Sequence, residues 1–103
     1  MIFKLIHITK EADFLQLALN QLPQWDEFIP WAEAFLSQLA LNSPFETNEG
    51  ADRHMLVFTF NRARFSLNYE SYCESVWIAA EEEAALTQLD ALELQLKTIA
   101  DAN

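Results

Sequence analysis

Glycine is almost absent from this sequence, in which Gly50 is the only one among 103 residues. Because a glycine-rich phosphate loop cannot be built from one glycine, dinucleotide-binding and P-loop sites are excluded. Glycine takes positive φ angles without a steric penalty, so Gly50 marks the one place where the chain can do so unhindered. We therefore expect a specialised loop at Gly50.

Cysteine and long apolar runs are scarce as well. Cys73 is the sole cysteine, which rules out a disulfide within the chain and gives no indication of an oxidising compartment. No apolar stretch approaches the roughly 20 residues of a membrane-spanning helix. Lys4 and His7 interrupt the apolar N-terminus before it reaches the length of a signal peptide. We expect a cytoplasmic protein without a membrane partner.

Basic residues are few, since six Lys and Arg face sixteen Asp and Glu and the formal net charge is −10. Such a charge repels phosphate backbones, so nucleic acid is not an expected partner, whereas a basic protein is. Arg53, Arg62 and Arg64 fall in one short segment that contains no acid. One alternative that stays open is an acidic inhibitor that occupies a basic site on another protein.

Hydrophobic residues, in contrast, make up 51% of the chain. Residues 1–103 are therefore expected to form a single domain that buries a core without disulfides or metals. Two β-strands are expected at residues 2–8 and 14–19, although leucine and alanine leave a short helix open for residues 13–19. A helix is expected to begin near Ile29 with Pro30 in its first turn, and residues 45–51 are expected to form a polar loop.

The most specific expectation concerns the alternating residues 53–80. If Asn61 and Arg62 form a two-residue turn, a hairpin follows, and a four-residue loop at residues 71–74 adds a third strand in register. The facing pairs are then mostly apolar: Phe60 with Ala63, Phe58 with Phe65, Leu56 with Leu67, His54 with Tyr69, and on the third strand Val76 with Tyr69, Ile78 with Leu67, and Ala80 with Phe65.

A terminal helix is expected to begin at the acidic run 81–83 and to bury Ala85, Leu89, Leu92, Leu96 and Ile99, which recur at helical spacing. The predicted fold class is therefore α+β, with an antiparallel sheet in ββαβββα order and both helices packed on one face.

The run Gly50-Ala51-Asp52-Arg53-His54, followed by the alternating strands and by Ser75-Val76-Trp77-Ile78, resembles a domain-of-unknown-function family of short acidic gammaproteobacterial proteins. The likeness rests on residues 50–78, with support from Trp25, Asp26 and Phe28 upstream. It implies an α+β fold and a bacterial, intracellular setting. It carries over no catalytic residue.

Asp52, Arg53 and His54 are candidate ligand-binding residues, because they combine a carboxylate, an anion clamp and an imidazole. Successive strand residues point to opposite faces, however, so a structural role is the competing interpretation, with Arg53 paired to Glu70 and His54 beside Tyr69. One histidine among loop acids lacks the spacing of a metal site, and no metal, cofactor or catalytic residue is expected.

Met55, Val57, Arg64 and Trp77 are candidate interaction residues, because they fall on the sheet face opposite the predicted helices and have an interface-like composition. In the alternative arrangement, the N-terminal hairpin folds over this face and makes a second small core. Our leading expectation is a non-catalytic module that binds a protein partner or forms a homodimer. The alternative is a small ligand-binding domain or enzyme centred on Asp52, Arg53 and His54.

Overall fold

The structure of the protein is a computed structural model that describes residues 3–39, 41, 46–50 and 53–102. Its elements follow the order β1 (Leu5–Lys10), β2 (Phe14–Leu19), α1 (Phe28–Ser37), β3 (Glu46–Glu49), β4 (Arg53–Phe60), β5 (Ala63–Glu70), β6 (Ser75–Ala80), α2 (Glu83–Leu86) and α3 (Leu89–Ala102). The six strands form one antiparallel sheet in the order β1-β2-β6-β5-β4-β3. The predicted α+β class is confirmed.

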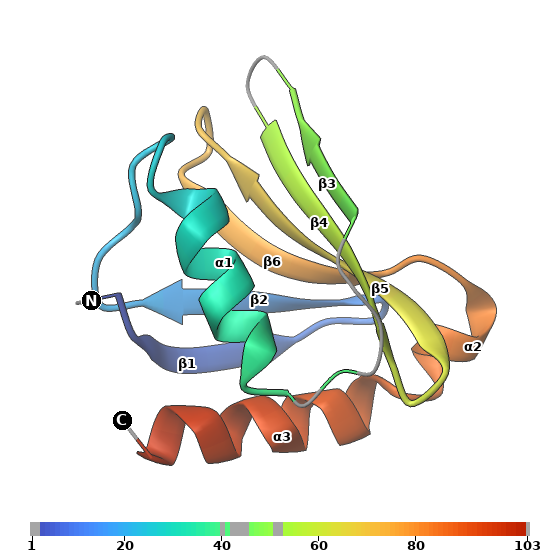
Figure 1. Ribbon diagram of the computed structural model, residues 1–103. Coiled ribbons are helices and arrows are strands. Elements are labelled where there is room, and N and C mark those ends of the chain that lie inside the picture. Colours follow the sequence, from blue (N-terminus) through green and yellow to red (C-terminus); the bar gives the residue numbers. More distant parts are fainter. Residues whose placement is uncertain (1–2, 40, 42–45, 51–52, 103) are drawn as a thin grey trace.

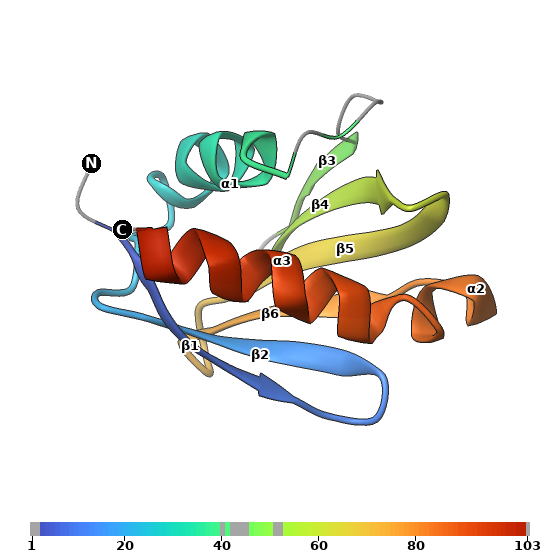
Figure 2. The same cartoon turned by 90° about the horizontal axis from the view of Figure 1, so that it is seen from below.

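Helices α1 and α3 lie on the same side of the strongly twisted sheet, and the core lies between them and the strands (Figure 1, Figure 2). No helix among the described residues lies on the other side of the sheet, and we call that side the open face. None of the helices in the described part of the chain is both long and apolar enough to cross a membrane.

The predicted register of β4, β5 and β6 is confirmed at every facing pair. Asn61 and Arg62 form the turn with φ of 51° and 65°, as the tight β-hairpin turn requires. Glu74, in the next turn, also has a positive φ, of 51°. Gly50 does not, so the expectation that glycine marks the positive-φ position was wrong.

Gly50 instead lies where there is little room for a side chain. Its backbone N–H donates to the Arg53 carbonyl oxygen at 2.7 Å, and a Cβ atom added to Gly50 would lie 3.0 Å from the same oxygen. A side chain at position 50 would therefore require the Arg53 backbone to move by a few tenths of an ångström.

The N-terminal hairpin is confirmed as two strands, and the helical alternative for residues 13–19 is excluded. The hairpin does not fold over the open face. Strand β2 instead pairs with β6, with Leu15 opposite Ile78, so that the hairpin widens the sheet. Burial of Leu15 and Leu17 beneath the helices explains this choice, since it places both leucines in the main core.

The prediction that residues 45–51 form a loop was wrong in part. Residues 46–49 form β3 and pair with β4. All four residues of β3 are exposed at the sheet edge. The sequence gives no apolar alternation there, because an edge strand with neither face buried does not require it.

The helices follow the prediction with one difference. Pro30 occupies the first turn of α1, whose buried residues include Phe28, Trp31 and Phe35. The terminal helix is split at residues 87–88, where the Thr87 hydroxyl donates to the Ala84 carbonyl oxygen at 2.8 Å. Such a bond competes with the helix backbone pattern. All five residues predicted for the buried face are in the core.

Candidate functional site

Arg53 and His54 point to opposite faces of the sheet, as neighbours on a strand must. Arg53 is exposed on the open face, whereas His54 is only 2% exposed within the core. Asp52 lies outside the described residues. The structure therefore does not bring the Arg53 and His54 side chains together on one side of the sheet to address a single ligand.

The His54 imidazole is held by contacts with core residues. Its ring centroid lies 3.6 Å from that of Trp25, and its Nε2 atom lies 3.0 Å from the Trp25 carbonyl oxygen. Since a carbonyl can only accept, Nε2 carries the proton. Nδ1 makes no hydrogen bond, and the nearest carboxylate oxygen, Glu49 Oε1, is 4.0 Å away. This imidazole serves packing and a backbone contact.

Arg53 faces Glu70 across β4 and β5, as predicted, but no ion pair joins these two described side chains. A polar depression of about 410 Å³ lies beside Arg53 and is lined by Asn48, Glu49, Gly50, Arg53, Met55 and Glu70. It lacks the apolar walls that ordinarily hold a small ligand.

The open face contains the predicted interaction residues, but not as one cluster. Met55 and Val57 are partly buried on β4, and Trp77 is partly buried on β6. Arg64 is exposed at the far end of β5, where its backbone N–H donates to Glu82 Oε2 at 3.2 Å. One row of register partners crosses the sheet through Trp77: Gln16, Trp77, Asn68, Met55 and Asn48.

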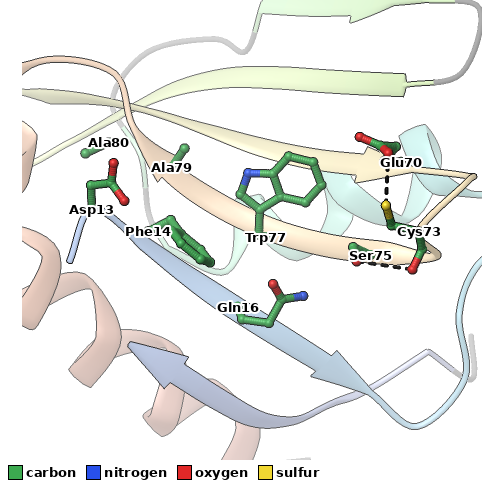
Figure 3. Close-up of a pocket in the computed structure, with 9 residues that line it drawn as sticks. All are labelled: Asp13, Phe14, Gln16, Glu70, Cys73, Ser75, Trp77, Ala79 and Ala80. Atoms are coloured by element: carbon green, nitrogen blue, oxygen red, sulfur yellow. Dashed lines mark hydrogen bonds between the residues drawn. The ribbon is translucent and has the colours of Figure 1, made fainter. Parts of the chain in front are cut away.

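A groove of about 370 Å³ surrounds Trp77 (Figure 3). Strand β2 forms one wall, and the end of β5 with the turn after it forms the other. The lining residues are Asp13, Phe14, Gln16, Glu70, Cys73, Ser75, Trp77, Ala79 and Ala80. Of these, only Trp77 was singled out from the sequence for this face. Glu70, Ser75 and Ala79 follow from the predicted register of β5 and β6, whereas Asp13, Phe14 and Gln16 depend on β2 pairing with β6, a long-range contact for which the sequence offers no local signal.

Beside the groove, two polar side chains are buried on the open face although no helix covers them. Asn68 Nδ2 donates to Ser66 Oγ at 2.9 Å, and Ser66 Oγ–H donates to Glu81 Oε2 at 2.6 Å. Ser66 and Asn68 are 1% and 3% exposed. These hydrogen bonds satisfy the buried polar groups of Ser66 and Asn68 within the protein. The two side chains therefore stabilise the open face and are not reactive groups.

Cys73 sits at the rim of the groove with its Sγ–H donating to Glu70 Oε1 at 3.2 Å. This hydrogen bond, together with repulsion between the Glu70 carboxylate and a thiolate, raises the pKa of Cys73. A nucleophilic cysteine requires the opposite shift.

Within the ranges that the structure describes, no group of three or more His, Cys, Asp or Glu side chains is arranged to hold a metal ion. Neither a curated protein nor a solved structure matches the chain. A family profile matches residues 3–97, and its description reads "Protein of unknown function (DUF3630)". Since this match includes both hairpins, the sheet and most of α3, the chain belongs to the DUF3630 family.

Proposed function

We propose that the protein is a non-catalytic interaction module that binds a protein partner, or a second copy of itself, through the open face around Met55, Val57, Arg64 and Trp77. The observation that carries the proposal is the environment of Trp77. Its large aromatic side chain is partly exposed at the centre of a sheet face that no helix covers. Tryptophan in this setting is typical of protein interfaces.

The three tryptophans of the chain differ in a way that supports this role. Trp31 is 3% exposed and its Nε1–H donates to the Phe3 carbonyl oxygen at 3.3 Å, so its polar group is satisfied inside the core. Trp25 is partly buried and its ring packs against His54. The Trp77 indole N–H has no hydrogen-bond acceptor in the described part of the chain, and a partner can therefore supply one.

The alternative, a ligand-binding or catalytic centre at Asp52, Arg53 and His54, has less support. Its imidazole is enclosed by Trp25 and Phe28, while the neighbouring Arg53 lies on the other side of the sheet. The lone cysteine fits a cytoplasmic setting for the interaction module, because disulfides are rare there.

Photo-crosslinking tests the proposal. A benzoylphenylalanine placed at Met55 on the open face is expected to give a discrete crosslinked product in the cells that make the protein. The same group at Gln95, exposed on α3, serves as the control. Trp77→Ala in the Met55-labelled protein should abolish the product.

Analytical ultracentrifugation separates the two kinds of partner. A dimer that dissociates on Trp77→Ala indicates self-association, whereas a monomer with a crosslinked product indicates another protein. A monomer that gives no crosslinked product beyond that of the Gln95 control would contradict the proposal.

A further inference from the structure

We infer that the groove around Trp77 binds the arginine or lysine side chain of a basic protein segment, with the cation beside the indole in a groove that has Asp13 at one end and Glu70 at the other. This inference rests on the proposed function and specifies the partner. It favours a basic protein over a second copy of this chain, because a second copy would bring a net charge of −10 to an acidic groove.

The groove has the charge pattern that such a side chain requires. Asp13 lies on one side of the Trp77 indole and Glu70 on the other (Figure 3). The Asp13 carboxylate takes part in no ion pair or hydrogen bond in the described part of the chain, and Glu70 accepts only the weak bond from the Cys73 thiol. Neither carboxylate is therefore neutralised by an ion pair with a described residue.

The basic residues nearest to Asp13 and Glu70 in sequence or register do not neutralise these two carboxylates. Lys10, near Asp13, is paired instead with Asp90, at 3.3 Å. Arg53 is the register partner of Glu70, but it lines the depression on the other side of β5 and forms no ion pair with that carboxylate. No base appears among the residues that line the Trp77 groove.

The aromatic and polar groups fit the rest of a long basic side chain. Phe14, Ala79 and the Trp77 ring provide apolar contact for methylene groups. A cation over an indole gains a further attraction that an uncharged side chain of the same shape lacks. A volume of about 370 Å³ lies at the small end of ligand pockets, a size suited to one long side chain with its backbone.

Nuclear magnetic resonance on the ¹⁵N-labelled full chain tests this inference. The probes are the blocked pentapeptide Gly-Ser-Arg-Ser-Gly and its uncharged counterpart with glutamine in the centre. The Trp77 indole resonance is assigned from its loss in Trp77→Phe. We expect the arginine peptide to shift that resonance saturably and the glutamine peptide to bind at least about 3-fold more weakly.

Charge variants locate the contact. Asp13→Asn and Glu70→Gln should each weaken binding of the arginine peptide by about 2- to 5-fold. Glu33→Gln, which removes one acid from an exposed position on α1, should leave the affinity unchanged. Equal weakening by all three variants would show attraction by overall charge alone, and would overturn the inference.

Two other results would also overturn it: equal shifts by the two peptides, or no shift by either one at millimolar concentration. The proposed interaction function is judged separately, by the crosslink at Met55. A crosslinked product without discrimination between the peptides would refute only the inference that the groove binds a basic side chain. Absence of the crosslink would refute the proposal that the protein is an interaction module.

Discussion

The His54 imidazole packs against the Trp25 indole, with ring planes tilted by 30°, and donates from Nε2 to the carbonyl oxygen of that same residue, 3.0 Å away. His54 on β4 thus contacts both the ring and the backbone of Trp25, which lies in the segment that leads into α1. The Phe28 ring lies nearly parallel to the imidazole, with ring centroids 6.1 Å apart, so His54 packs among aromatic rings. The contact ties the entry of the first helix to the centre of the sheet.

Substitution of His54 should therefore change stability according to the volume removed. We expect His54→Ala to lower the free energy of unfolding by about 2–4 kcal/mol, since it leaves a cavity between Trp25 and Phe28. His54→Phe should cost about 1 kcal/mol, because it keeps the ring and loses one hydrogen bond. Urea denaturation measures both. Equal losses for the two variants would contradict a packing role.

The same substitution should cost much more stability at Trp31 than at Trp77. Trp31→Ala removes a buried ring and a hydrogen bond, and should cost about 3–5 kcal/mol. Trp77→Ala should cost at most about 1 kcal/mol, because its ring is partly exposed and no helix packs on it. Thermal denaturation followed by circular dichroism distinguishes them. A large loss for Trp77→Ala would assign that residue to the core.

Cys73 should react slowly with iodoacetamide at neutral pH. The hydrogen bond to Glu70 and the negative charge of that carboxylate raise the thiol pKa, so the reactive thiolate is scarce. Glu70→Gln should speed alkylation several-fold between pH 7 and 8. Glu74→Gln, a matched loss of one acid in the same turn, should have a smaller effect. The reverse order would show that Glu70 is not the controlling group.

Tyr69 should make the fold sensitive to alkali. Burial, followed by the carboxylates of Glu74 and Glu27, raises its pKa above the ordinary 10.0. A group whose pKa is raised by folding favours its protonated form in the native state, so its contribution is complete below pH 10 and declines as pH rises through the folded pKa.

The decline above pH 10 should therefore be less steep in Tyr69→Phe than in the parent protein. Tyr72→Phe is the matched control, because Tyr72 is 83% exposed in the turn after β5. Urea denaturation between pH 8 and 11 measures the effect. In Tyr72→Phe, Tyr69 is the remaining tyrosine, and its ionisation can be followed by absorbance at 295 nm.

The residues that could be placed from the sequence were those with a local pattern. Alternation in residues 53–80 predicted the register of β4, β5 and β6, since a slip by one residue would expose Phe58 and Phe65. The polar strand β3 has no such pattern. The groove around Trp77 depends on β2 lying beside β6, residues some 60 positions apart, and local periodicity contains no information on that pairing.

Local sequence was also an incomplete guide to the backbone. A single glycine suggested one position of positive φ, yet Asn61, Arg62 and Glu74 all take that conformation. Asparagine tolerates it well, and the twist of the flanking strands selects it in a two-residue turn. At Gly50, the missing side chain matters for closeness to Arg53 and not for φ.

The short outer strand β3 also limits how other chains can approach. Its residues Glu46 and Glu49 are exposed along a sheet margin whose outer backbone groups have no neighbouring strand in the described structure. Negative side chains on such a margin discourage continuation of the sheet by another molecule, and so guard against fibrous aggregation. We therefore expect another chain with little positive charge to be repelled from the edge of the sheet at β3.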